Sequence, residues 1–228
     1  MNHSAPRLTL CALTLLTLFT RAASAAEGKF EKEIAAFEAA DKKQPPPRDA
    51  VLFIGSSSIR MWKSLAEDFP GIPVINRGFG GSQIADSTMY ADRIAIPYHP
   101  RLIVMYAGDN DIGGGKTPQQ VRDNFKAFVD KVRSAQPDVP IDYISIKPSI
   151  KRWALVDKIK EANALIEQYA KSEKNVTYID CFTPMLGPDG KPRPELLRPD
   201  GLHMTPEGYK LWVSILTPYV KAQGGGEK

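Results

Sequence analysis

Apolar and polar residues occur along the chain in blocks whose lengths predict strands and helices in turn. Five short apolar runs have the length and the β-branched content of buried strands. Between and after them lie longer segments in which apolar residues recur every three or four positions, as on one face of a helix. The strand-like runs are AVLFIG (50–55), IPVIN (72–76), LIVMYAG (102–108), IDYISI (141–146) and VTYID (176–180).

The longer segments predict four amphipathic helices. The first, at 27–43, places Phe30, Ile34 and Phe37 at helical spacing, and the proline-rich stretch QPPPRD ends it. The other three helices are predicted at 117–135, 153–172 and 205–222.

Strands separated by helices predict repeated βαβ units and therefore an α/β fold. We expect a five-stranded, mostly parallel sheet with helices on both faces. No internal repeat and no second domain is evident, so residues 50–222 are expected to form one domain. An N-terminal helix and connector (26–49) would precede it, and a disordered tail (223–228) would follow. Ligands of such folds bind at the carboxyl ends of the strands, so the loops after the strands are the candidate site.

The N-terminal residues 1–25 are expected to be a signal peptide. Arg7 precedes an apolar run at 8–19, and Ala-Ser-Ala at 23–25 offers a small-residue cleavage site. The run is shorter than the roughly 18 apolar residues of a membrane-spanning helix. Cys11 lies inside the run, which argues against a lipid-anchor cysteine. We expect a secreted or periplasmic protein without stable membrane insertion; the alternative is an uncleaved membrane anchor.

Charge and cysteine content narrow the classes of partner. The chain has 30 Lys and Arg against 26 Asp and Glu, a formal net charge of +4. Loss of Arg7 and Arg21 on cleavage would lower that charge to about +2, and no basic cluster remains, which argues against nucleic acid as a partner. Cys181 would be the single cysteine left, so the mature chain cannot form an internal disulfide.

Two histidines remain as candidate general bases. His99 comes just before the strand at 102–108, at the amino edge of the sheet, whereas His203 follows the last strand and can return to the carboxyl edge. We therefore expect His203 to be the base. With so few histidines, no HExxH and no cysteine cluster, a zinc site is not supported. Nothing in the sequence requires a magnesium site, and we expect neither metal nor cofactor.

Asp200 lies three residues before His203, close enough in the chain for its carboxylate to reach the imidazole. A carboxylate there would hold the ring in one tautomer and stabilise the imidazolium. The alternative is that Asp200 only caps the last helix, which Thr205 and Pro206 also suit, and that His203 is merely packed.

Three serines, 56–58, follow the first strand directly. A serine in a strand-to-helix turn can attack a carbonyl while its own N–H stabilises the oxyanion. Most serines at helix starts are only caps, and the residues alone do not decide among the three. Further candidate donors are the N–H groups of Gly80 and Gly81 and the side chain of Asn110, although each glycine also suits an ordinary turn.

Four segments, in order, resemble the motif blocks of the SGNH hydrolases, also called GDSL-like lipases and acylhydrolases. The resemblance covers about residues 50–220 and implies a three-layer αβα, flavodoxin-like fold that needs no cofactor. The segments are FIGSSSI (53–59), NRGFGGS (76–82), GDND (108–111) and DGLH (200–203).

By position, the resemblance implies that Ser57 is the nucleophile, His203 the general base and Asp200 its orienting carboxylate. Ser56 stands where the family usually has aspartate, which removes a carboxylate near the nucleophile. The implied reaction is hydrolysis of an ester through an acyl-enzyme. The implied oxyanion donors are the N–H groups of Ser57 and Gly81 and the side chain of Asn110.

The substrate is less well defined by the sequence. The family acts on lysophospholipids, thioesters, acetylated sugars and small esters; export disfavours acyl-coenzyme A. No long apolar lid is evident, so short acyl groups, with carbohydrate esters favoured, are expected. The alternatives are a lysophospholipase, an acyltransferase of the same mechanism and an inactive binding module. A dinucleotide-binding loop at GFGGSQ is disfavoured, since Gln83 stands where the third glycine is needed.

Side chains near the active edge are candidate substrate contacts. Trp62 and Trp153 have the alternative interpretation of core packing on their helices. The candidates are Trp62, Arg152 and Trp153, with Tyr106 and Lys147 nearby.

Overall fold

The computed structural model describes Met1 and residues 28–222, so the predicted signal peptide beyond Met1 and the predicted tail lie outside the described residues. Five parallel strands form one sheet in the order β2-β1-β3-β4-β5. This is the flavodoxin-like strand order. The predicted α/β fold is confirmed. The strands are β1 Val51–Gly55, β2 Val74–Gly78, β3 Leu102–Tyr106, β4 Ile141–Ile144 and β5 Val176–Ile179.

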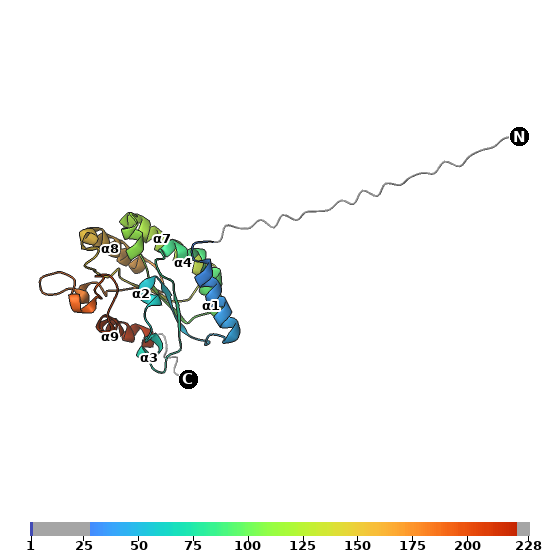
Figure 1. The fold of residues 1–228 in the computed structure, drawn as a ribbon, viewed down its shortest axis with the longest axis horizontal. Coiled ribbons are helices and arrows are strands. Elements are labelled where there is room, and N and C mark those ends of the chain that lie inside the picture. Colours follow the sequence, from blue (N-terminus) through green and yellow to red (C-terminus); the bar gives the residue numbers. More distant parts are fainter. Residues whose placement is uncertain (2–27, 223–228) are drawn as a thin grey trace.

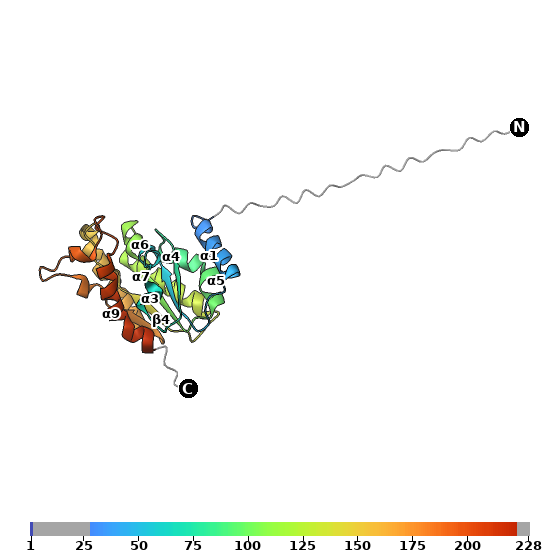
Figure 2. The ribbon, with the colours of Figure 1, turned by 60° about the horizontal axis from the view of Figure 1, so that its bottom comes forward.

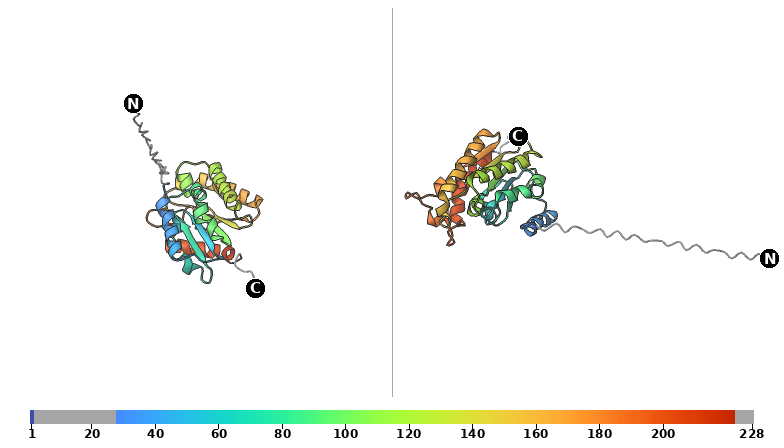
Figure 3. Two further views of the ribbon diagram at one scale, coloured as in Figure 1. Left: turned by 90° about the vertical axis from the view of Figure 1, so that its right-hand side faces the viewer. Right: turned by 90° about the horizontal axis from the view of Figure 1, so that it is seen from above.

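Helices cover both faces of the sheet and make the three layers (Figures 1 and 3). Helices α1, α4, α5, α7 and α8 pack on one face, and α2, α3 and α9 pack on the other. The α-helices are α1 Glu31–Lys43, α2 Ser57–Arg60, α3 Leu65–Asp68, α4 Ile84–Met89, α5 Ala91–Ile94, α6 Asp109–Gly113, α7 Pro118–Arg133, α8 Val156–Ser172 and α9 Pro206–Ala222. The 3₁₀ helices are η1 Ile96–Tyr98, η2 Trp153–Leu155, η3 Thr183–Met185 and η4 Pro194–Leu196.

The sheet is buried on both faces, which explains why its strands are continuous apolar runs. Successive residues of β1 point to opposite faces: Leu52 and Ile54 join the cluster under α7 and α8, while Val51 and Phe53 join the cluster under α9. Every residue of β1 and of β3 is buried. The loops that follow β1 and β3 therefore leave fully buried strands.

Helix α1 lies beside α5 at the edge of one layer (Figure 2). It begins at Glu31, four residues after the predicted start, and buries Phe30 and Ile34 against the domain. Arg93 of α5 bridges Glu31 and Glu38 of α1 at 2.8 and 2.7 Å. Exposed ion pairs contribute only about 0–1 kcal/mol each, so apolar packing provides most of the attachment.

The strand order creates one crevice at the carboxyl edge of the sheet. The chain runs outward from β1 to β2 and then crosses to β3 on the other side of β1. The loops that leave β1 and β3 therefore diverge, which is where ligands bind in open α/β sheets. Within residues 28–222, no helix has the length and apolar character needed to span a membrane.

Candidate active site

The turn after β1 presents one serine of three. Gly55 ends the strand at φ +137°, and a Cβ there would lie 1.9 Å from the carbonyl oxygen of Tyr106, so only glycine fits. Ser56 and Ser58 are 2% and 3% exposed. Ser57, the first residue of α2, is half-buried, and its hydroxyl is the one that reaches the histidine. The geometry therefore singles out Ser57.

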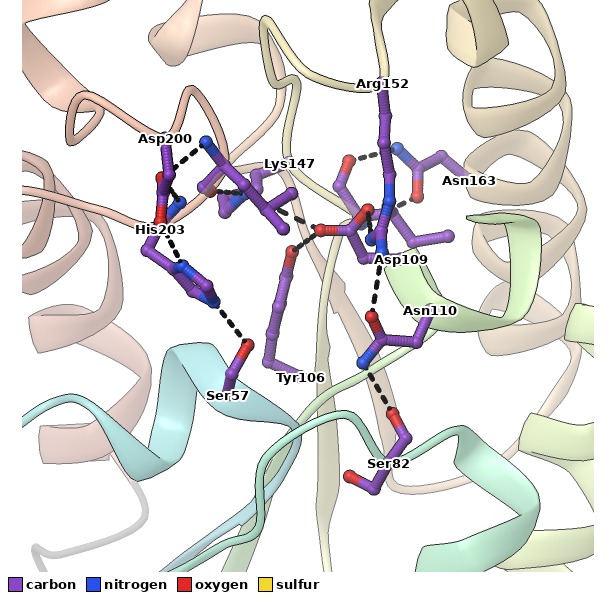
Figure 4. Close-up of polar contacts among 12 residues, drawn as sticks. Ser57, Ser82, Tyr106, Asp109, Asn110, Lys147, Arg152, Asn163, Asp200 and His203 are labelled. Atoms are coloured by element: carbon purple, nitrogen blue, oxygen red, sulfur yellow. Dashed lines mark hydrogen bonds and ion pairs between the residues drawn. The ribbon is translucent and has the colours of Figure 1, made fainter. Parts of the chain in front are cut away.

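His203 connects Ser57 to Asp200 (Figure 4). The Ser57 Oγ and the His203 Nε2 are 3.1 Å apart, and the His203 Nδ1 lies 2.6 Å from an oxygen of Asp200. With the Nδ1–H donating to the carboxylate, Nε2 is left unprotonated and can accept the serine proton. This arrangement is the one that a general base requires.

The loop that carries Asp200 and His203 is braced internally. The second oxygen of Asp200 accepts the N–H groups of Leu202 and His203, both at 2.9 Å. Partial desolvation opposes ionisation, but the hydrogen bonds from the His203 ring and from these two N–H groups hold the pKa of Asp200 well below its usual range. Thr205 Oγ1 accepts the Gly208 N–H and caps α9, so Asp200 is not that cap.

The loops that follow β1, β2 and β3 contain candidate oxyanion donors. Gly81, in the turn after β2, has φ +81°, and the N–H groups of Ser57 and Gly81 have no protein acceptor among residues 28–222. Asn110, in the first turn of α6, donates one amide hydrogen to the carbonyl oxygen of Ser82 at 2.9 Å. Its second amide hydrogen remains available to a ligand. These donors can bind the oxyanion of a tetrahedral intermediate.

A buried charge cluster supports the site from behind. Asp109 is 4% exposed. Its carboxylate accepts a hydrogen bond from the Arg152 guanidinium and lies 3.6 Å from the ammonium nitrogen of Lys147. Lys147 is fully buried and donates to the carbonyl oxygen of Leu202 at 2.6 Å. Burial lowers the pKa of Lys147, and the neighbouring Asp109 carboxylate partly opposes this. Lys147 therefore links the loop that contains Leu202 and His203 to Asp109.

The role of Asp109 was missed by the sequence reasoning. It lies directly before Asn110. Three consecutive polar residues, 109–111, directly after a predicted buried strand were the available signal. Ser56, in the position where the resemblance leads one to expect aspartate, uses its backbone N–H to bond the carbonyl oxygen of Tyr106 at 3.0 Å.

The prediction that Trp62 contacts substrate is wrong. Its side chain is 1% exposed and packs against Phe53, Phe69 and Trp212 in the core, as the alternative interpretation held. Its indole N–H donates to Asp68 at 2.6 Å. Helix α2 ends at Arg60, so Trp62 lies beyond it and helical spacing does not determine where its side chain points.

Other predicted residues take distinct places. Trp153 is half-buried at the start of η2 and makes no hydrogen bond to Ser57, Asp200 or His203. His99 ends η1 before β3, at the opposite edge of the sheet, and its ring contacts Gln136 at 3.3 Å. Among the described residues, no group of three or more His, Cys, Asp or Glu side chains is placed to hold a metal ion.

Comparisons with known proteins identify the family of the chain. The family model of the GDSL-like lipase/acylhydrolase family matches residues 55–211. A search of curated proteins found no match.

Among solved structures, a GDSL-like lipase from Bacteroides thetaiotaomicron has 21% identity and a TM-score of 0.73, covering 83% of this chain and 97% of that one. The lipase/acylhydrolase from Enterococcus faecalis has 18% identity and a TM-score of 0.58, covering 76% and 96%. A carbohydrate esterase family 3 protein from Talaromyces cellulolyticus has 16% identity and a TM-score of 0.57, covering 76% and 96%. The family match spans more than half of the chain, which therefore belongs to the GDSL-like lipase/acylhydrolase family of hydrolases acting on ester bonds.

Proposed function

We propose that this protein is a serine esterase that removes short acyl groups from small or carbohydrate esters through an acyl-enzyme. The observation that carries the proposal is the hydrogen-bonded chain from Ser57 through His203 to Asp200, with links of 3.1 and 2.6 Å. A hydroxyl, an imidazole and a carboxylate in this order make up the machinery of serine acyl transfer.

The steps follow from the contacts. His203 takes the Ser57 proton as the serine oxygen attacks the ester carbonyl, and Asp200 stabilises the imidazolium. The N–H groups of Ser57 and Gly81 and the Asn110 amide bind the oxyanion. His203 then protonates the leaving alcohol, and water attacks the acyl-enzyme by the same route in reverse.

The open character of the site supports a short acyl group. The side chains of His203 and Asp200 are 25% and 42% exposed. A long acyl chain would gain roughly 0.8 kcal/mol for each buried CH₂ group, and an open rim provides little surface for such burial.

The alcohol part of the substrate is proposed to be a carbohydrate. The partly exposed side chains at this edge, Ser57, Asp200 and His203, are all polar. The fold similarity to the Talaromyces carbohydrate esterase supports this choice, whereas the similarity to the Enterococcus lipase/acylhydrolase favours the lipid alternative. An acyltransferase would differ only in the acceptor of the acyl group.

Labelling with a fluorophosphonate tests the mechanism. The wild-type protein is expected to label and Ser57→Ala is not, with ester turnover falling about 10⁶-fold, because the nucleophile is lost. Ser56→Ala, one residue away, is the matched control and should retain labelling. Equal labelling of the Ser57→Ala variant would overturn the proposal, as would an unlabelled wild type, which a binding module predicts.

Substrate range has its own test. Rates on p-nitrophenyl esters from acetate to palmitate should fall beyond short chains, and acetylated oligosaccharides should release acetate. A preference for palmitate or for lysophospholipid would replace the short-chain proposal with the lipase alternative. Transfer of the acyl group to an added alcohol at the expense of hydrolysis would identify an acyltransferase.

Export is part of the proposal and rests on the sequence alone. Arg7, the apolar run at 8–19 and the small residues at 23–25 support cleavage after Ala25. Mass spectrometry of the protein recovered from outside the cytoplasm should give an N-terminus at Ala26, and an intact N-terminus in the membrane fraction would contradict it.

A further inference from the structure

The guanidinium of Arg152 bridges two side chains of α6 (Figure 4). One terminal nitrogen bonds the Asp109 carboxylate, and the other donates to the Asn110 Oδ1 at 3.0 Å. The side chain of Arg152 is 19% exposed, and both terminal nitrogens are engaged with the protein. Arg152, predicted from the sequence as a substrate contact, thus binds Asn110, whose amide is a proposed oxyanion donor.

The amide of Asn110 has only one orientation that satisfies both neighbours. Its oxygen faces the cationic Arg152, and its nitrogen faces the carbonyl oxygen of Ser82. Rotation by 180° would set the amide oxygen against the Ser82 carbonyl and the NH₂ group against the guanidinium. Two repulsive contacts would then replace two hydrogen bonds.

We propose that Arg152 is a positioning residue for the oxyanion hole: it fixes the Asn110 amide so that the second N–H points at the substrate oxygen. This inference rests on the proposed function. The guanidinium also withdraws charge from the amide oxygen, which strengthens its N–H as a donor. Arg152 acts on the reaction through Asn110 and not by contact with the reacting atoms.

The surroundings are shaped for a guanidinium. Asp109 and Asn110 are adjacent acceptors that match the planar fork of arginine, which a lysine ammonium cannot contact in the same way. Gly113, one turn further along α6, leaves the space that Arg152 fills. A Cβ on Gly113 would lie 2.7 Å from the Arg152 Nε and 2.9 Å from its Cζ. Gly113→Ala should therefore displace the guanidinium without removing a charge.

A double-mutant cycle tests the inference. Asn110→Ala should lower kcat by about 10²- to 10³-fold. Arg152→Lys should lower kcat at least about tenfold with KM little changed, since the lost interaction serves the transition state. In the Asn110→Ala background, Arg152→Lys should cause no further loss. The matched control is Arg93→Lys, which alters a carboxylate-bridging arginine far from the site and should leave kcat unchanged.

Gly113→Ala provides an independent test of the inference if the Arg152→Lys variant fails to fold. It should reproduce the loss in kcat, and the loss should vanish when Asn110 is already alanine. Equal losses from Arg152→Lys in both backgrounds, or a rise in KM as the main effect, would overturn the inference. An unchanged kcat in Asn110→Ala would overturn it too, while the esterase proposal is tested separately by Ser57→Ala.

Discussion

The buried carboxyl of Asp142 predicts a distinctive dependence of stability on pH. Asp142 lies on β4 between β3 and β5, is 3% exposed and pairs in register with Thr177. Burial raises its pKa to about 6, and a hydrogen bond with the Thr177 side chain only partly opposes this. The folded chain therefore holds a proton that the unfolded chain releases near the ordinary aspartate pKa of 3.8.

The sign follows from which state binds the proton. Below pH 3.8 both states are protonated, and Asp142 favours neither. Between 3.8 and about 6, the unfolded state loses its proton first, so the free energy of unfolding falls as pH rises. Above about pH 6 both states are ionised, and the loss in free energy of unfolding caused by Asp142 no longer changes with pH. At 1.36 kcal/mol per pKa unit, this difference in pKa corresponds to about 3 kcal/mol at neutral pH.

Asp142→Asn removes this titration while preserving size and hydrogen bonding. In urea unfolding at pH 4, 5, 6, 7 and 8, the free energy of unfolding of the variant should rise relative to that of the wild type as pH increases. The difference should reach about 3 kcal/mol at pH 7. Asp138→Asn is the control, because the Asp138 side chain is 85% exposed and should show no such trend. A difference between Asp142→Asn and wild type that is constant with pH, or a less stable variant at pH 7, would refute the reasoning.

Three further substitutions test the frame of the site. Asp200→Asn should lower kcat about 10⁴-fold by disturbing the tautomer of His203, while thermal unfolding changes little; near-wild-type turnover would contradict this role. Lys147→Met leaves the buried carbonyl of Leu202 without its donor and should lower the free energy of unfolding by about 1–3 kcal/mol in urea titrations. Gly55→Ala would force a Cβ into the backbone of β3, so little folded protein is expected in the soluble fraction, and wild-type yields would count against the predicted clash.

The sheet was predictable because its strands are buried on both faces. Continuous apolar runs such as 102–106 leave no other placement, and the long helices α7 and α8 show clear helical periodicity. The short helices between them were not predicted, because four to six residues contain too few turns to show a period. The start of α1 was placed four residues early, since Glu27 and Gly28 continue the polar pattern without a cap.

The sequence indicated which residues lie at the candidate site, but it did not indicate the contacts between residues distant in the chain. The order of loops at one edge indicated one of the serines 56–58, together with Asn110 and His203, and the family resemblance selected Ser57. The link from Arg152 to Asn110 spans 42 residues and depends on the exact path of a loop, which no local pattern encodes. The burial of Trp62 likewise depends on where a one-turn helix ends.

Ser57 and His203 are 146 residues apart in the sequence. The helix that follows His203, α9, contacts the turn that carries the serine. In α9, Tyr209 donates to the carbonyl oxygen of Ser58 at 2.9 Å. Without α9 this hydrogen bond cannot form, so the serine turn reaches its final support only when α9 packs against the sheet. The contact between Ser57 and His203 thus depends on packing between segments that are far apart in the sequence, and we expect shortening of α9 to weaken it.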